Sequence, residues 1–217
     1  MELGGFGRLQ MSDVIEEYRS GAVSVKRRRV PHAARVSQPV WTRLARVAGV
    51  HTDERSWRAG ARGEELVAKE LSGLGEGWCV LHAIPAGEPG SDIDHLVIGT
   101  AGVFCLETKH HKRDSIWVAG DVFMVNGQRQ PYIRDSRYEA RRVSRILASA
   151  SGLPIVARGV VVVVNANSLA VRTRPNDVDV VNKLELRSWL LERPNAIDRA
   201  TVERVSDVAR RSSIWSA

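Results

Sequence analysis

The sequence predicts an α/β fold with a mixed central β-sheet flanked by helices. Three observations support this class: an amphipathic helix pattern at residues 60–74, three short apolar runs directly after it, and a continuous apolar run that ends at residue 164. A run that is apolar on both faces is typical of a strand buried inside a sheet. Helices that alternate with such strands cover the faces of the sheet.

The first half of the predicted domain is one helix followed by three strands, expected at residues 60–74, 78–84, 93–98 and 102–108. The helix pattern depends on Val67, Leu71 and Leu74, which recur along one face. The link between the second and third strands is short and begins and ends with glycine. These two strands are therefore expected to pair antiparallel, as a hairpin.

The second half begins with another hairpin and continues with alternating helices and strands. The elements are expected at residues 116–118 and 122–125 (the hairpin), 136–150 (helix), 155–164 and 178–181 (strands), and 184–192 and 198–211 (helices). Asn126-Gly127 makes a further turn after the hairpin. Asp198 is expected to cap the last helix, because a side-chain oxygen at that position accepts a hydrogen bond from the first turn.

Length and composition indicate one folded domain behind a basic arm. The chain has 217 residues, of which 43% are hydrophobic and 26% charged, and this mixture excludes a wholly disordered or collagen-like protein. We expect an arm at residues 1–57 with one short helix near 41–47, a domain at 58–211 and a tail at 212–217.

The excess of positive charge lies mainly in the arm. The formal net charge is +7, and residues 1–60 contribute +5 of it, from 11 basic and 6 acidic side chains. The run Lys26, Arg27, Arg28 and Arg29 is the densest part. Such a run either contacts a polyanion, nucleic acid or an acidic membrane surface, or is a solvated charge cluster.

The cysteine content favours a reducing, cytoplasmic location. Cys79 and Cys105 are too few for a disulfide framework, and both fall in apolar strand patterns, where a free thiol behaves as a small hydrophobic group. No stretch approaches the roughly 20 apolar residues that a membrane-spanning helix needs. The aromatic residues are few, 6%, and scattered, so no base-stacking platform is expected.

The most informative segment is SDIDHLVIGTAGVFCLETKH, residues 91–110. Strand alternation places Cys105, Glu107 and Lys109 on one face, so an apolar stripe ends in a carboxylate and an ammonium group. Asp94 lies 13 residues before Glu107, and the hairpin allows the two carboxylates to approach each other. Two such carboxylates can hold a hard divalent ion such as Mg²⁺.

Glu64 is a third candidate carboxylate, because it lies on the apolar side of the first helix. An acidic side chain on that side needs a partner or a metal ion. Structural interpretations stay open for each residue. Glu64 can be a first-turn acid, Asp94 a strand-edge residue, and Glu107 with Lys109 an exposed ion pair of little energetic value.

The ordered set of motifs resembles the nuclease-related domain, NERD, a branch of the PD-(D/E)xK nuclease-like superfamily. The similarity extends from about Arg58 to about Val164. It includes Gly63-Glu64 in the first helix, the segment DIDHLVIGTAGVF, the triplet Glu107-Thr108-Lys109, the sequence IWVAGD, and GVVVVVN. The resemblance implies a restriction-endonuclease-like αβββαβ core and metal-dependent cleavage of phosphodiester bonds.

By this resemblance, Mg²⁺ or Mn²⁺ would be bound by Asp94, Glu107 and the Thr108 carbonyl, with Glu64 as a direct or outer ligand. Lys109 would orient the attacking water or stabilise developing charge. One feature departs from the family: related sequences often carry a Gln at the start of the helix after the hairpins, and residues 131–140 contain none. Arg134 or Arg137 could take its place at a phosphate.

The same helix carries a basic stripe formed by Arg134, Arg137, Arg141 and Arg145. The stripe is either a phosphate-contacting surface or a solvated helix face. The histidines at 95, 110 and 111 lack the spacing of a zinc site. The sequence hypothesis is therefore a Mg²⁺-dependent nuclease acting on nucleic acid, in the first place DNA. The alternative is a catalytically inactive domain that binds nucleic acid or a protein.

Overall fold

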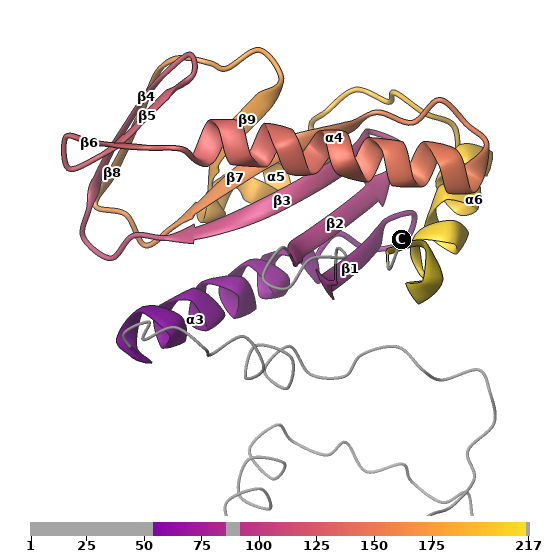
Figure 1. The fold of residues 1–217 in the computed structure, drawn as a ribbon, viewed down its shortest axis with the longest axis horizontal. Coiled ribbons are helices and arrows are strands. Elements are labelled where there is room, and N and C mark those ends of the chain that lie inside the picture. Colours follow the sequence, from indigo (N-terminus) through magenta and orange to yellow (C-terminus); the bar gives the residue numbers. More distant parts are fainter. Residues whose placement is uncertain (1–53, 86–91, 216–217) are drawn as a thin grey trace, which may run out of the picture. The chain divides into compact units, whose positions relative to one another are not determined.

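The computed structural model describes residues 54–85 and 92–215 and confirms the α/β class (Figure 1). Helices cover both faces of a central sheet of mixed strand direction. The predicted arm helix and the basic run of the arm lie outside the described residues.

The central sheet has five strands in the order β1-β2-β3-β7-β9. Their bounds are Cys79–Ile84, Ile93–Gly99, Gly102–His110, Ala157–Val164 and Val178–Asn182. The first three strands pair antiparallel, whereas β3, β7 and β9 run parallel. All of the last six residues of β7 are buried, as expected for an inner strand covered on both faces.

Each face of this sheet is covered by two helices. On one face, α3 (Glu54–Leu71) and α5 (Leu186–Leu191) share a core with β3 and β7. On the other face, α4 (Tyr132–Ser151) crosses the sheet, and α6 (Arg199–Ala209) packs beside it (Figure 1). The Asp198 side chain caps α6, as predicted, and accepts a 2.7 Å hydrogen bond from the Thr201 N–H. Short 3₁₀ turns occupy Lys183–Glu185 and Ser212–Trp215.

The strands outside the central sheet form a second sheet, which was not predicted from the sequence. It has four strands in the order β6-β5-β4-β8, at Gln128–Gln130, Val122–Val125, Ser115–Ala119 and Ser168–Thr173. The predicted hairpin is confirmed as β4 and β5, but β6 and β8 were missed. The inner face of this second sheet packs through Ile116 and Phe123 against Ile133 of α4 and Val161 of β7.

Several elements are longer than predicted, and two of these differences, in β3 and α4, affect the site. β3 extends to His110 because β7 pairs with it, residue by residue, as far as Val164. α4 begins at Tyr132, four residues before the predicted start. Pro131 at its N-terminus suits a helix start, since proline has no N–H to satisfy there. No helix within residues 54–85 and 92–215 has the length and apolar content to cross a bilayer.

Candidate active site

Asp94 and Glu107 lie on neighbouring strands and on the same face of the central sheet. The pairs Leu96–Cys105 and His95–Leu106 set the register of β2 on β3, and one further step places Asp94 opposite Glu107. Leu96 and Cys105 both belong to the core on the α4 face. Strand alternation therefore directs the two carboxylates to that face.

The edge of β3 is open at the level of these carboxylates. β3 pairs with β2 only as far as Leu106, but with β7 as far as His110. Asp94 uses the open edge: its Oδ2 accepts a 2.7 Å hydrogen bond from the Thr108 N–H. The N–H and the C=O of one strand residue point to the same edge. The Thr108 carbonyl is therefore directed to the side on which Asp94 lies.

Glu107 and Lys109, two residues apart on β3, form a largely buried ion pair. We call the partly buried group of Asp94, Glu107 and Lys109 the recess. The side chains of Glu107 and Lys109 are 14% and 25% exposed, and Lys109 Nζ bonds Glu107 Oε1. The other carboxylate oxygen, Glu107 Oε2, is buried and has no hydrogen-bond partner within the part of the chain that the structure describes. Lys109 Nζ also lies 4.7 Å from the centre of the Tyr132 ring, at the start of α4. A buried carboxylate oxygen without a partner is costly unless a cation or a water molecule satisfies it.

Glu64 approaches the same carboxylates from the opposite face. A Cβ atom built on Gly63 would lie 3.2 Å from both the Thr108 methyl and His110 Cβ, so glycine allows α3 to come close to β3. The neighbouring Glu64 is half-buried and lies near Asp94 and Asp92, which repel its charge. Burial, followed by this repulsion, raises the pKa of Glu64 to about 8.

The recess holds more carboxyl groups than basic groups. Burial raises the pKa of Asp94 to about 6, although the hydrogen bond from Thr108 opposes the shift. Burial also raises the pKa of Glu107, against the attraction of Lys109. Burial by itself lowers the pKa of Lys109, but Glu107 and Asp94 raise it above its ordinary value. The ammonium group is thus held in its charged form.

Glu139 of α4 is a fourth carboxyl group near the recess and was not among the residues predicted from the sequence. Its Oε2 lies 4.0 Å from the Cys105 Sγ. Burial, followed by repulsion from Glu107 and Asp94, raises its pKa to about 8. The residue spacing along α4 does indicate that Glu139 faces the sheet. Glu139 lies three residues after Ser136 and four before Val143, and both of these residues are buried.

The segment that holds this recess matches a known protein family. Residues 59–164 match the family model of the nuclease-related domain, NERD. This segment is a NERD domain. The comparisons with curated proteins and with solved structures gave no match.

The NERD domain belongs to the PD-(D/E)xK-like nuclease superfamily, as the resemblance in the sequence indicated. The matched segment extends from α3 to Val164, the last residue of β7, and includes Glu64, Asp94, Glu107 and Lys109. Nucleases of this superfamily usually use divalent metal ions.

The donor atoms of the recess are carboxylate and carbonyl oxygens, the type that Mg²⁺ and Mn²⁺ prefer. The unpartnered Glu107 Oε2 lies on the face that Glu107 shares with Asp94, and it is a suitable ligand for such an ion. Among the described residues, no three His, Cys, Asp or Glu side chains converge on one point as a ready metal cluster. An ion here would therefore be bound by one or two carboxylates together with the backbone carbonyl and water.

The arginine stripe of α4 is largely paired with the protein's own carboxylates. Arg137 bonds Asp177 at 2.6 Å and Asp121 at 2.7 Å. Arg134 pairs with Asp135 at 2.9 Å, and Arg141 lies 3.9 Å from Asp177. These contacts line a shallow surface pocket with Tyr138 and Asn176. The pairing reduces the positive charge that the stripe presents to a phosphate.

The three histidines singled out in the sequence make their polar contacts outside the recess of the NERD domain. His95 is buried on the face opposite Asp94, and its Nδ1 lies 2.7 Å from the Nδ1 of His82. Burial lowers the pKa of His95 to about 3. His110 contacts Asn165 at 2.9 Å, and His111 contacts Asp114 at 3.1 Å.

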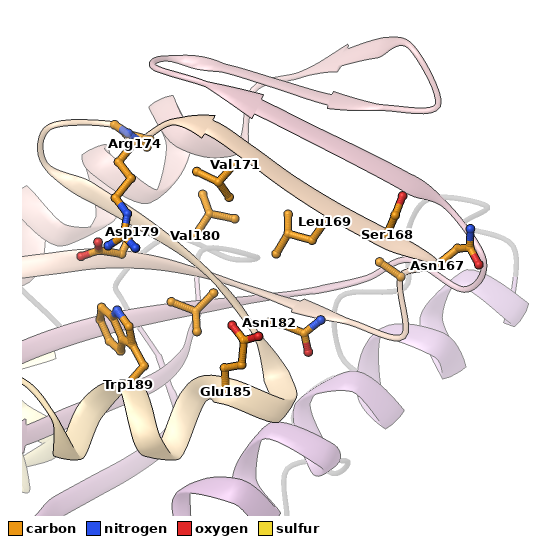
Figure 2. Close-up of a pocket in the computed structure, with 13 residues that line it drawn as sticks. Asn167, Ser168, Leu169, Val171, Arg174, Asp179, Val180, Asn182, Glu185 and Trp189 are labelled. Atoms are coloured by element: carbon orange, nitrogen blue, oxygen red, sulfur yellow. The ribbon is translucent and has the colours of Figure 1, made fainter.

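A pocket of about 320 Å³ lies away from the recess, between β8, β9 and α5 (Figure 2). Leu169 and Val180 line its middle, while Asp179 and Trp189 lie at one end. Asp179 is buried and already pairs with Arg158 and with Arg193. None of the residues that line this pocket belongs to the carboxylate recess.

Proposed function

We propose that this chain is a divalent-metal-dependent nuclease that hydrolyses phosphodiester bonds in DNA. The observation that carries the proposal is the arrangement of Asp94, Glu107 and Lys109 on one face at the open edge of β3, with one buried Glu107 oxygen unpartnered. An ion pair between Glu107 and Lys109 that served only stability would not need the Asp94 carboxylate beside it. Membership of the NERD family supports the same chemistry.

In this proposal, Asp94, Glu107 and the Thr108 carbonyl bind Mg²⁺ or Mn²⁺, and Glu64 is a direct or outer ligand. When bound, the ion lowers the pKa of a water molecule and attracts a nonbridging phosphate oxygen. The hydrogen bond from the Thr108 N–H holds the Asp94 carboxylate in place. The backbone of β3 thus orients one ligand and supplies another.

Lys109 acts on the reacting groups in this proposal. Its ammonium group is held between Glu107 and the Tyr132 ring, so its position is fixed before the substrate arrives. It orients the attacking water and stabilises the charge that grows on the phosphoryl oxygens. A positive group placed in advance is effective because no reorganisation is needed during the reaction.

The net charge of the chain supports a nucleic-acid substrate, and its free thiols support a cytoplasmic location. A formal net charge of +7 favours a polyanionic substrate. Cys79 and Cys105 are buried free thiols, which suits a reducing cytoplasm.

The alternative is a domain that binds nucleic acid or a protein without cleaving. The observation in its favour is the missing Gln, since residues 131–140 contain none and Arg137 pairs with Asp121 and Asp177. Incubation with supercoiled, linear and single-stranded DNA in Mg²⁺, Mn²⁺ or EDTA separates the two functions. We expect cleavage that EDTA abolishes; no cleavage of any DNA or RNA substrate would favour the inactive domain.

Lys109→Ala and Asp94→Asn test the roles of the site residues. Lys109→Ala should lower the cleavage rate by about 10²-fold or more, the effect of removing one transition-state stabiliser. It should leave Mg²⁺ affinity nearly unchanged, because the carboxylates supply the ligand charge. Asp94→Asn should instead weaken Mg²⁺ binding, since a neutral amide replaces a charged oxygen. Calorimetry and turnover on labelled DNA measure the two quantities. Equal cleavage by wild type and Lys109→Ala would refute the assignment of Lys109.

A further inference from the structure

The second sheet has an outer face that points away from the core. Its inner residues Ile116 and Phe123 are buried, so their neighbours on the strands face outward. Directly paired residues form one outward row across all four strands: Ala170, Trp117, Met124 and Arg129. Trp117 is central in this row and is 39% exposed.

The four strands of this sheet carry positive charge only. Their sequences, SIWVA, VFMV, QRQ and SLAVRT, contain two arginines and no acidic residue. Arg129 and Arg172 are both exposed, and neither forms an ion pair with another residue of the described segments. Arg172 is the extra residue at the bulge between β4 and β8, two positions beyond Ala170. The two arginines thus lie on the two outermost strands, with Trp117 and Met124 between them.

This face differs from the arginine stripe of α4 in one decisive respect. On α4, three arginines lie beside Asp121, Asp135 and Asp177, whereas the outer face of the second sheet has no such carboxylates in its strands. The inner face of the same sheet adjoins the recess, because Phe123 contacts the Tyr132 ring, and that ring contacts Lys109. A nucleic-acid strand bound on the outer face is therefore on the opposite side of this sheet from Lys109, and the face is a binding surface separate from the proposed catalytic residues.

We propose that the outer face of the second sheet binds single-stranded nucleic acid, with a base stacked on Trp117 and phosphates on Arg129 and Arg172. This deepens the proposed function, on which it rests for the class of substrate. An aromatic side chain between cations is the combination that single strands need, because every unpaired base offers a flat face and every linkage a negative charge. A duplex hides its bases and would contact only the arginines.

The charge of the face favours a polynucleotide over a protein or a second copy of this chain. Two copies would bring like charges together, and the strands offer no carboxylate to balance them. The small Ala170 beside Trp117 leaves room for a flat group at the indole. Both features are expected of a stacking site.

Binding can be measured apart from cleavage, in EDTA, by the fluorescence anisotropy of a labelled oligothymidylate and of a matched duplex. Trp117→Ala should weaken single-strand binding about 5-fold or more, and the duplex less. Trp117→Phe should retain most of the affinity, since it keeps an aromatic face. Arg129→Gln, at an exposed position, should lower the slope of log affinity against log salt by about 0.7. Leu184→Ala and Arg211→Gln, exposed positions outside the second sheet, are the controls and should bind as wild type.

Several results would overturn this inference: no binding of the single strand by wild type, full affinity in both Trp117→Ala and Arg129→Gln, or equal losses for single strand and duplex. A wild-type dimer that Trp117→Ala dissociates in sedimentation velocity would instead make the face a self-association surface. All binding is measured in EDTA, in which metal-dependent cleavage does not take place. The effect of Trp117→Ala on binding is therefore measured independently of whether the wild-type protein cleaves DNA.

Discussion

The carboxyl groups in and around the recess repel one another when they are ionised, and the fold holds them close together. Glu64 on α3 and Glu139 on α4 lie on opposite faces of the sheet, yet the charge on Asp94 raises the pKa of both. Lys109 neutralises only part of this charge. Such an arrangement is unfavourable for an empty protein and favourable for one that binds a divalent cation.

The free energy of unfolding should therefore depend on pH in a specific direction. Glu64 and Glu139 have pKa values near 8 in the folded protein, against an ordinary value of 4.5. Between these values the folded state binds more protons than the unfolded state, so stability falls as pH rises. In EDTA, urea unfolding should show the highest stability near the acidic end of this window and a loss toward about pH 8. Mg²⁺ should reverse much of the loss, because it binds the ionised form.

Glu139→Gln tests the origin of this pH dependence. The amide does not ionise, so the decline in stability should become shallower, and the melting temperature at about pH 8 should rise by about 2–4 °C for each kcal/mol gained. Glu203→Gln, at an exposed position on α6, is the matched control and should leave the profile unchanged. Identical profiles for Glu139→Gln and wild type would contradict the repulsion argument.

At the scale of elements, glycines determine how closely the helices approach the sheet. Gly63 allows α3 to lie against Thr108 and His110 of β3. Gly159 does the same for α4 on β7, where an added Cβ would lie 2.7 Å from the Ser136 hydroxyl. The two helices bring Glu64 and Glu139 to the recess. Close packing at these two positions is thus a condition for the site.

Gly63→Val should displace α3 from β3 and move Glu64. A Cβ at this position meets side-chain atoms at 3.2 Å, and a branched side chain needs still more room. Overpacking of this kind costs about 1–3 kcal/mol. We expect a lower melting temperature together with weaker Mg²⁺ binding by calorimetry.

Gly60→Ala is the matched control on the same helix, because nothing lies within 4 Å of its added Cβ. Alanine in a helix interior should stabilise the protein by about 0.5–1 kcal/mol and leave Mg²⁺ affinity unchanged. Unchanged Mg²⁺ affinity in a folded Gly63→Val variant would show that α3 does not position a ligand.

The sequence predicted those elements whose own pattern reveals them. The apolar run of β7 and the paired runs of β2 and β3 show their nature locally. β6, with the sequence QRQ, has no apolar residue and is a strand only because β5 lies beside it. β8 needs β4 as its partner in the same way, across more than 40 residues of chain. The role of Glu139 was hidden for a similar reason, since helix periodicity does not show which face meets a charged recess.

At the scale of the whole molecule, positive charge is distributed unevenly. Of the net +7, +5 belongs to residues 1–60, and the remaining +2 to residues 61–217. Within the described part, Arg134, Arg137 and Arg141 of α4 lie beside Asp121, Asp135 and Asp177. Attraction of a polyanion over a distance therefore depends mainly on the N-terminal residues. A preference for single-stranded over duplex nucleic acid would come from the second sheet.

Two full-length variants test this division, each with four positive charges replaced by Gln. The first changes Lys26, Arg27, Arg28 and Arg29; the second changes Arg134, Arg137, Arg141 and Arg145; each lowers the net charge from +7 to +3. The first should weaken DNA binding in EDTA and reduce the salt slope by up to about 3–4, at about 0.7–0.9 for each phosphate that the protein no longer neutralises. Its melting temperature should not change.

The second variant should change the salt slope less, because three of its four arginines are already paired, and should melt at a lower temperature. Arg137 joins α4 to Asp121 and Asp177 through two short bonds, and their removal leaves two carboxylates facing each other without a cation. Anisotropy titrations at several salt concentrations, together with thermal unfolding, separate the two effects. A larger drop in slope for the second variant than for the first would place the phosphate-binding residues on α4. Two proteins of equal net charge would then differ in affinity only through where their charges lie.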